Sequence, residues 1–531
     1  MINLIPFFIL FLASVAILYI QQKNVKLGYS WFLAVGAGIV TWAVILSFHW
    51  VSQPSFILEG KGLIQNTSIE LAYQMDQFSF PYALALISLG IVIILTDLGR
   101  SQVSASSPWT WAGILAIMGT GFLAIISVSP FAIIFSWTII DLIEILFITR
   151  SLSDNRMVME NILAFSARVT GTMVLVVATF YSRSLGQDLL LSDLTPAVGI
   201  LLLIATGLRL GVIPLHLPYQ EIGPRRGMGT IIRIIGPASS LVILSRLPVP
   251  VVMPVWGPWL SLFLCVTMLY TSLMWLTSSD EITGRPYWII TLSSFAMLCA
   301  IRSQTIASIG WGIGLILSGG VLFLYSSRKT QLLFLPLLGL IGISGLPFTP
   351  VVSSWRAIFV DGFDAVGVVF ILSHGLILLG YLRHTFHEGI PFDSLDRWAQ
   401  ILLPLGLLIL IANEWFLGVF GWPDSFIPGF WIGNTILFLL VLFLYVAYTR
   451  YKDRLPIFRQ RKWLETGKKI LGFITQVLSL RWLILAGLFI YQVIQRVVGR
   501  LILLLEGEGG ILWALLLLVL VVSIANGGRF F

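Results

Sequence analysis

Charged residues are scarce in this sequence. Only 11% of its 531 residues are Asp, Glu, Lys or Arg, whereas 58% are hydrophobic, and the mean hydropathy is +0.96. Such a composition excludes a soluble domain, which needs a charged surface. Apolar runs of about 20 residues, long enough to cross about 30 Å of hydrocarbon, recur from one end of the chain to the other. The sequence therefore predicts an all-α polytopic membrane protein.

Cysteine is nearly absent, and so are the common cofactor motifs. Cys265 and Cys299 lie in separate apolar runs and form no CxxC pair, metal-ligand spacing or disulfide framework. The sequence has no P-loop, no GxGxxG after a strand and no HExxH. We therefore expect no nucleotide, haem, iron–sulfur or zinc site, and no cofactor or metal, in this chain.

The basic residues that are present give a net charge of +8 and lie mostly in loops beside apolar runs. That placement indicates contact with a membrane surface rather than with nucleic acid. The first apolar run, 4–20, has no basic segment before it and no small-residue cleavage site after it. We expect it to be a retained helix and not a removed signal peptide.

The apolar runs predict a series of membrane helices with short loops between them. Residues 57–73 alternate weakly between polar and apolar, which favours a hairpin. The helices are expected at about 3–20, 29–49, 80–97, 109–127, 131–149, 159–181, twice within 201–247, then at 257–277, 286–301, 309–326, 332–359, 364–383, 401–420, 428–449 and 511–525.

Two of these runs combine proline with polar groups. Arg209 lies in an apolar run and is followed five residues later by Pro214. A charge in a membrane helix costs about 2.5–3.5 kcal/mol and usually faces the interior of a bundle. Proline frees backbone groups that only protein or a water-filled cavity can satisfy, and ion transporters use this combination. The alternative is that Arg209 snorkels to a headgroup. Helix breaks are expected at Pro214, Pro218, Pro237, Pro347 and Pro350.

The short loops predict an orientation. If every expected helix crosses, one side collects Lys23, Lys26, Arg150, Arg156, Arg225, Arg226, Arg328, Lys329, Arg383 and the basic residues of 450–462. By the positive-inside rule that side is the cytoplasm, and the N-terminus is outside. Arg183 and Arg302 fall on the other side. Residues 467–508 mix apolar stretches with Lys, Arg and Gln, so we expect an amphipathic helix lying along the cytoplasmic face; the alternative is that 483–502 crosses the membrane.

Four short segments carry a family resemblance. They are 69–80 with its Asp76-Gln77-Phe78-Ser79, the stretch from Arg209 to His216, Gly345-Leu346-Pro347-Phe348-Thr349, and Gly380-Tyr381-Leu382-Arg383. Together they resemble the antiporter-like proton-translocating membrane subunits of respiratory complex I, a family shared with multisubunit cation/proton antiporters and membrane-bound hydrogenases. Their order and spacing hold over residues 1–383. The resemblance implies a core of about 14 helices with inverted repeats, a broken seventh and twelfth helix, and a C-terminal extension with a lateral helix, as in the largest complex I subunit.

The same resemblance implies a row of buried charges that relays protons, and that row is eroded here. The family's Glu after an aromatic falls at Thr138, although Asp141 and Glu144 follow one and two turns later on the same face. The family's Lys falls at Arg209, which keeps a charge but cannot release a proton. Further relay positions fall at Ala238, Ser318, Leu322 and Trp355, the last beside Arg356.

We therefore expect the first half to keep a carboxylate–Arg209 pair and the second half to be nearly uncharged. Asp141 and Glu144 are the candidate partners of Arg209, unless both lie in water near a helix end. His216 and His374 are candidate titratable groups; a headgroup-level His216 and a His374 bonded to a backbone carbonyl are the alternatives. The candidate ion path is thus Asp141, Glu144, Arg209, His216, His374 and Arg356.

The resemblance implies a division into helices 1–127, a first half-channel repeat 128–250, a second repeat 251–390, helices 391–450 and a C-terminal extension 451–531. It implies a transport subunit of a complex resembling the NADH-quinone oxidoreductase, in a bacterial plasma membrane, conducting protons or bracing its neighbours. Its partners would be other membrane subunits and the bilayer, with redox chemistry in those partners. The alternatives are a cation/proton antiporter or inorganic-carbon transport subunit, and a non-conducting assembly subunit.

Overall fold

The computed structural model describes residues 2–23, 27–50, 56–61, 68–97, 108–150, 155–186, 195–219, 226–247, 256–325, 327–328, 332–359, 362, 364–387, 390–392, 395, 397–421, 427–451, 489, 492–499 and 510–525. They belong to two compact units, Met1–Leu455 and Pro456–Phe531. Within the described ranges, ten helices are long and apolar enough to cross a membrane, and four shorter helices are apolar. The predicted helical membrane architecture is confirmed.

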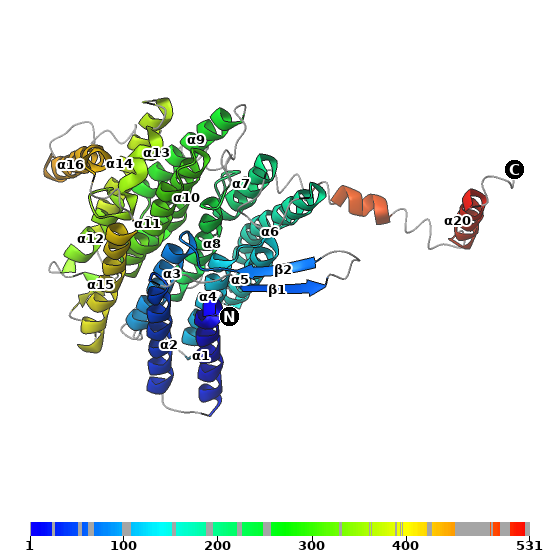
Figure 1. Ribbon diagram of the computed structural model, residues 1–531, viewed down its shortest axis with the longest axis horizontal. Helices are drawn as coiled ribbons and strands as arrows, with labels where there is room; N and C mark the ends of the chain where they lie inside the picture. Colours follow the sequence, from blue (N-terminus) through cyan, green and yellow to red (C-terminus); the bar gives the residue numbers. More distant parts are fainter. Residues whose placement is uncertain are drawn as a thin grey trace. The chain divides into compact units, whose positions relative to one another are not determined.

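The first part of the chain is a set of helices that follows a short 3-10 turn at Ile2–Leu4 (Figure 1). Proline is the first residue of three of them, because a missing N–H costs nothing at a helix start. The helices are α1 (Ile5–Gln22), α2 (Leu27–Ser47), α3 (Ser79–Asp97), α4 (Pro108–Ile126), α5 (Pro130–Arg150), α6 (Asn155–Ser184), α7 (Pro196–Leu210) and α8 (Met228–Leu244).

The second part of the chain is also mainly helical. One boundary differs from expectation: α10 begins at Glu281, because the Asp280 carboxylate accepts a hydrogen bond from the Thr283 N–H at 2.7 Å and caps the helix. The elements are α9 (Gly257–Thr277), α10 (Glu281–Ile301), α11 (Thr305–Leu324), β3 (Ser327–Arg328), α12 (Phe334–Ile343), a 3-10 turn η5 (Pro350–Ser353), α13 (Ser354–Ile358), α14 (Ala365–Thr385), β4 (Ile390–Pro391), α15 (Arg397–Phe420), α16 (Pro428–Tyr451) and, in the second unit, α20 (Gly510–Ala525).

The expected hairpin is present as β1 (Phe56–Lys61) and β2 (Ser68–Tyr73), paired antiparallel. Its inner end docks on the end of α4, where the Gln74 N–H donates to the Ile126 carbonyl at 2.8 Å and the Val128 N–H donates to Ala72 at 2.9 Å. Figure 1 shows the two strands beside α5. The hairpin thus fixes the chain that leads into α3.

Both expected helix breaks occur, and each begins before its prolines. Helix α7 ends at Leu210, where Gly211 adopts a left-handed φ of +74°. Helix α12 ends at Ile343, and Gly345 has φ +73°. Glycine reaches this region without strain, so the glycines stop the helices and the prolines prevent them from restarting.

The expected break at Pro237 is wrong, because α8 continues through that residue. Proline removes one backbone hydrogen bond, and membrane helices tolerate this where neighbouring hydroxyls and packing compensate. The Ser239 and Ser240 hydroxyls donate to the Gly236 carbonyl at 2.8 and 2.9 Å. The carbonyl that loses its helical donor at Pro237 is that of Arg233, so these bonds do not replace the missing one. Every residue of α8 is also buried, so tight packing holds the helix together.

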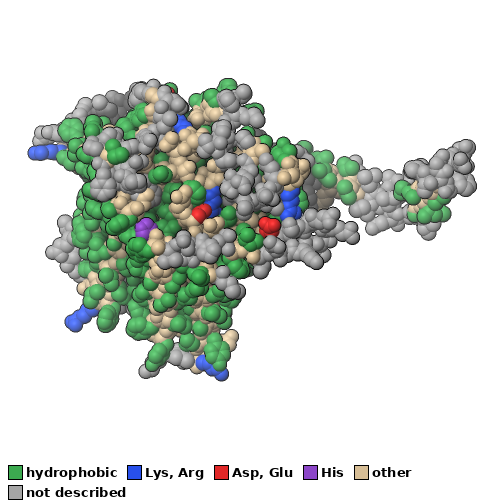
Figure 2. Space-filling model, viewed as in Figure 1, with side chains coloured by type: hydrophobic (Ala, Val, Ile, Leu, Met, Phe, Trp, Pro, Cys, Tyr) green, Lys and Arg blue, Asp and Glu red, His purple; other side chains and the backbone are tan. Residues whose placement is uncertain are grey.

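Helices α3 and α11 form the centre of the first unit. All residues of α3 and nearly all of α11 are buried, as expected for helices that are apolar on every side. Helices α1, α2, α6 and α16 instead expose many large hydrophobic side chains, and Figure 2 shows a face dominated by hydrophobic groups. These surfaces suit lipid.

Most of the segment 467–508, expected to form a lateral helix, lies outside the described residues, as does the basic stretch 450–469 after its first two residues. Within it the structure describes 489 and 492–499, which are helical. Helix α20 is present where the last crossing was expected.

Candidate functional site

A buried ion pair joins α5 to α7. The Arg209 guanidinium donates to both carboxylate oxygens of Asp141, at 2.6 and 2.9 Å. Both side chains are at most 4% exposed, which excludes the snorkelling position for Arg209 and the wet position for Asp141. Arg209 also donates to the Thr172 hydroxyl at 3.1 Å and lies 4.3 Å over the Trp137 ring. Sequence reasoning therefore identified this pair.

A second arginine, Arg168 on α6, completes a four-residue cluster that the sequence analysis missed. Its Nη1 is 3.0 Å from the Glu144 carboxylate, and its Nε is 3.4 Å from Asp141. Both carboxylates are 3% exposed. The signal was available, because Arg168 is a lone cation in an apolar stretch just as Arg209 is. We call Asp141, Glu144, Arg168 and Arg209 the ion-pair quartet.

The quartet is balanced in charge and closely packed. Two carboxylates face two guanidiniums, so each ion has the partner that a buried charge needs. Gly171 lets α6 approach α7, since a Cβ there would lie 2.8 Å from the Ala205 carbonyl and 2.9 Å from Arg209 Cγ. Charge-assisted, bidentate pairs of this kind are strong and fix geometry.

The quartet is tied to the break after α7. Arg168 donates to the Pro218 carbonyl at 3.1 Å, and His216 is buried with its Nδ1 2.7 Å from the Pro214 carbonyl. The predicted site residue His216 thus lies in the break, although it makes no hydrogen bond to the quartet among the described contacts. A movement of Arg168 would act directly on this irregular segment through the hydrogen bond to Pro218.

Glu144 also faces the centre of the molecule. It lines a narrow recess with Ile117, Thr120, Ile140, Ile232 and Ile235. Ile232 is next to the buried Arg233 on α8, whose guanidinium lies 5.2 Å from the Tyr219 ring. Arg233 is a further charged residue that sequence reasoning missed.

Buried charge continues toward the second part of the chain, which corrects the expectation of a nearly uncharged second half. Arg285 on α10 is fully buried and donates to the Thr230 hydroxyl on α8 at 2.9 Å. Glu281, at the start of α10, is buried and pairs with Arg226. The expected helix began at 286, so both residues had been assigned to a loop.

The other positions at which the resemblance places relay residues are apolar or weakly polar. Ala238 and Leu322 are at most 1% exposed. Ser318 donates to the Glu414 carboxylate of α15 at 2.5 Å, so an acid absent from the candidate list reaches this position. The side chain of Arg356, in α13, lies outside the described residues.

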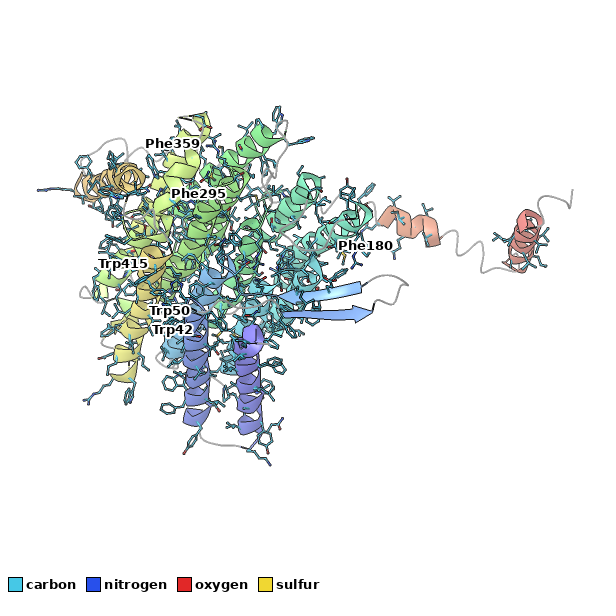
Figure 3. All side chains as sticks on the ribbon, viewed as in Figure 1. Trp42, Trp50, Phe180, Phe295, Phe359 and Trp415 are labelled. Carbon is cyan, nitrogen blue, oxygen red and sulfur yellow. The ribbon has the colours of Figure 1, made fainter. Side chains whose placement is uncertain are left out.

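His374 on α14 is fully buried among aromatic rings, and its Nε2 is 2.9 Å from the Ile343 carbonyl at the end of α12. The nearby rings include Phe295, labelled in Figure 3, and Trp311. This is the carbonyl-bonded state that the sequence left open as an alternative.

The Asp76-Gln77-Phe78-Ser79 motif has a structural explanation. Asp76 accepts from the backbone of Ser79 at 2.7 Å, and the Ser79 hydroxyl accepts from the Asp76 N–H at 2.8 Å. Arg246, just after α8, pairs with Asp76 and donates to the carbonyls of Ser127 and Ile125 at the end of α4. The motif therefore ties α3, α4 and α8 together at one end.

The quartet combines two protonatable groups with two permanent cations. Within the described ranges, no group of three His, Cys, Asp or Glu side chains comes together. Asp141 and Glu144 can take up protons, whereas the arginines stay charged. A proton reaching one carboxylate would leave its guanidinium without that partner.

Sequence comparison finds no relative: no family model and no curated protein matches the chain. Structural comparison does find matches. A chain of the Mrp complex from Dietzia sp. DQ12-45-1b superposes with a TM-score of 0.71 and 11% identity, over 100% of this chain and 63% of that one. A chain of the membrane-bound sulfane sulfur reductase, an archaeal respiratory membrane complex, gives 0.67 and 12%, over 98% and 99%.

The chain has the fold of antiporter-like membrane subunits. The predicted resemblance is thereby confirmed at the level of the fold, as is the expectation of an integral membrane protein. The chain spans less than two thirds of the Mrp chain, 63%, but nearly the whole of the reductase chain. In this antiporter-like fold, the ion-pair quartet lies beside the first of two broken helices.

Proposed function

We propose that the chain is an ion-translocating subunit of a multisubunit membrane complex, in which the quartet couples proton uptake to movement at the α7 break. The observation that supports this most directly is the position of Arg168. It contacts Glu144 at 3.0 Å, lies 3.4 Å from Asp141, and binds the Pro218 carbonyl in the break. One cation is thus shared by two acids and an irregular segment.

The coupling follows from charge balance. When a proton neutralises Glu144, Arg168 loses its closer partner and is drawn toward the Asp141 carboxylate, its other partner. Arg168 then pulls on the segment that holds Pro218. Neither arginine needs to release a proton, so this scheme suits a chain in which arginine stands where the family has lysine.

The partners we propose are other membrane subunits, because the two matched folds occur in the Mrp complex and in a respiratory membrane complex. Redox chemistry would reside in partner subunits, and the basic loops would face the cytoplasm with the N-terminus outside. Purification from native membranes in mild detergent, with mass spectrometry of what co-purifies, tests this. Partners with flavin or iron–sulfur motifs would support a respiratory role; antiporter partners would support cation/proton exchange.

The transport test uses inverted native membrane vesicles with a pH-sensitive dye. Glu144→Gln removes the group that takes up the proton, and Asp141→Asn removes the charge that draws Arg168 away from it. Each should reduce substrate- or cation-driven proton movement by about tenfold or more, since a charge-assisted hydrogen bond contributes about 1.5–3 kcal/mol. Asp364→Asn is the matched control, because Asp364 also pairs with an arginine, Arg302 at 2.6 Å, but at another helix end. Wild-type transport in both quartet variants would instead support a non-conducting, bracing subunit. In such a subunit the four ions would stay paired and serve only to hold the helices together.

A further inference from the structure

Glu414 is a buried acid outside the ion-pair quartet. It is the only charged residue in the apolar run 401–420, it lies in α15, and its exposed fraction is 0%. Trp415, the next residue, is labelled in Figure 3 beside α12. Such an acid is rare in a membrane helix and is usually functional.

The contacts of Glu414 hold its carboxyl group in one place. The Ser318 hydroxyl of α11 donates to Oε1 at 2.5 Å, and the backbone of Ser318 in turn accepts from the Tyr381 hydroxyl at 3.0 Å. A Cβ at Gly342 would lie 2.3 Å from Glu414 Cδ, so the carboxyl lies directly against α12. Its Oε2 is buried with no hydrogen-bond partner among the described residues.

The carboxyl lies against the last turn of α12, where the helix breaks. His374 contacts the Ile343 carbonyl at 2.9 Å, and Asn434 donates to the Gly345 carbonyl at 2.9 Å. The C-terminal end of a helix carries partial negative charge. Broken helices with exposed carbonyls form proton and cation sites in transporters.

The surroundings of Glu414 favour the protonated form of its carboxyl group. An isolated ionised carboxylate in an apolar interior costs many kcal/mol, so it must be paired or neutral. Among the described residues, no arginine, lysine or histidine pairs with Glu414 within 4 Å. The negative end of α12 makes the ionised form still less favourable. An unpartnered Oε2 is where an acidic proton would reside.

We propose that Glu414 is the proton-binding carboxyl of the second half of the molecule, reaching from α15 to the position that the family's relay residue occupies at Ser318. On release, the Oε2–H bond breaks, the proton passes to water as hydronium and the carboxylate remains. Its role in translocation rests on the proposed function, whereas its protonation does not. The titratable and charged groups on or next to the elements around it are Tyr82 and Asp97 of α3, His49 after α2, His374, Tyr381, Arg383 and His384 of α14, and Arg397 of α15; α11, α12 and η5 contain none.

Infrared spectroscopy of the purified complex in lipid tests the protonation. The wild type at neutral pH should show the C=O stretching band of a protonated carboxylic acid, which shifts to lower frequency in D2O. Glu414→Gln, which keeps the size and the acceptor for Ser318, should lose this band. Glu281→Gln is the control and should keep it, because the Glu281 carboxylate is a buried acid that has an arginine partner, Arg226.

Ser318→Ala gives a second way to assign the infrared band to Glu414 if the Glu414→Gln variant does not assemble. Removing the donated hydrogen bond should move the band to higher frequency. The proposal is overturned if the band is missing from the wild type, unchanged in Glu414→Gln, unmoved in Ser318→Ala, or resistant to deuterium exchange. None of these outcomes depends on transport, so the proposed function can fail separately, through wild-type transport in the Asp141 and Glu144 variants.

Discussion

Arg209 on α7 binds both oxygens of Asp141 on α5, and both side chains are at most 4% exposed. Removing one member of a buried pair costs about 3–5 kcal/mol, because the other is left uncompensated. Asp141→Asn and Arg209→Gln should therefore each lower the melting temperature of the detergent-solubilised protein.

The double variant Asp141→Asn/Arg209→Gln should recover much of this loss, since it removes both charges together. Thermal unfolding of the four proteins in one detergent gives the coupling free energy between the two positions. Additive losses in the double variant would contradict the view that the two residues stabilise each other.

Arg168→Lys tests whether one cation is shared between two acids. A lysine cannot present two donors in the planar fork of arginine, so we expect one of the two contacts to be lost. A charge-assisted hydrogen bond contributes about 1.5–3 kcal/mol, so proton transport should fall by roughly tenfold or more. Arg183→Lys is the control, because Arg183 lies in the last turn of the same helix and stacks on Phe131. Equal transport in the two variants would refute the shared-cation scheme.

Acid sensitivity should be governed in part by Asp76, which lies outside the membrane-spanning helices. Burial alone would raise its pKa, but the charge of Arg246 and the hydrogen bonds from Arg246 and Ser79 outweigh burial and lower it. A carboxyl with a lowered native pKa stabilises the fold above its unfolded value of about 3.9, and this contribution is lost as pH falls through the native pKa.

Asp76→Asn should therefore melt at a lower temperature than the wild type at pH 7. The difference should shrink as the pH falls below about 4, where the wild type also loses the charge. Melting curves across this range measure it. A difference that stays constant with pH would mean that Asp76 acts through its hydrogen bonds alone.

The helices were predictable because apolar run length is a local property. The Asp141–Arg209 pair was also found, since a lone cation and a carboxylate in neighbouring apolar runs need each other. Arg168 and Glu414 carry the same signal, but neither lies at a position where the resemblance places a relay residue. The long-range contacts of Glu414 with Ser318 and Gly342 could not be deduced, since they depend on how α15 packs.

The ends of the helices show a different limit of prediction from sequence. Pro237 was expected to break α8, yet full burial on every side holds that helix together, and burial depends on tertiary packing. In contrast, the stops after α7 and α12 are local, because Gly211 and Gly345 adopt left-handed φ values. A proline therefore indicates a weak point in a membrane helix, and the surrounding helices decide whether it becomes a break.

Gly342→Ala tests the packing of Glu414 against α12. The added methyl group would lie 2.3–2.4 Å from the carboxyl atoms, so Glu414 must move, and overpacking of this kind costs about 1–3 kcal/mol. We expect a lower melting temperature and a shifted infrared band of the protonated acid. Gly36→Ala in α2, where a Cβ would meet nothing within 4 Å, should leave both unchanged.

The double variant Gly342→Ala/Glu414→Ala separates this clash from general damage to α12. Without the carboxyl, the methyl group at 342 has space and fills part of the cavity left by Glu414, so the double variant should be more stable than Glu414→Ala alone. Contacting residues show coupling of about 0.5–3 kcal/mol, which melting curves of the four proteins can resolve. If Gly342→Ala destabilises the protein equally with and without Glu414, then the glycine serves the backbone of α12 and the carboxyl does not lie against it.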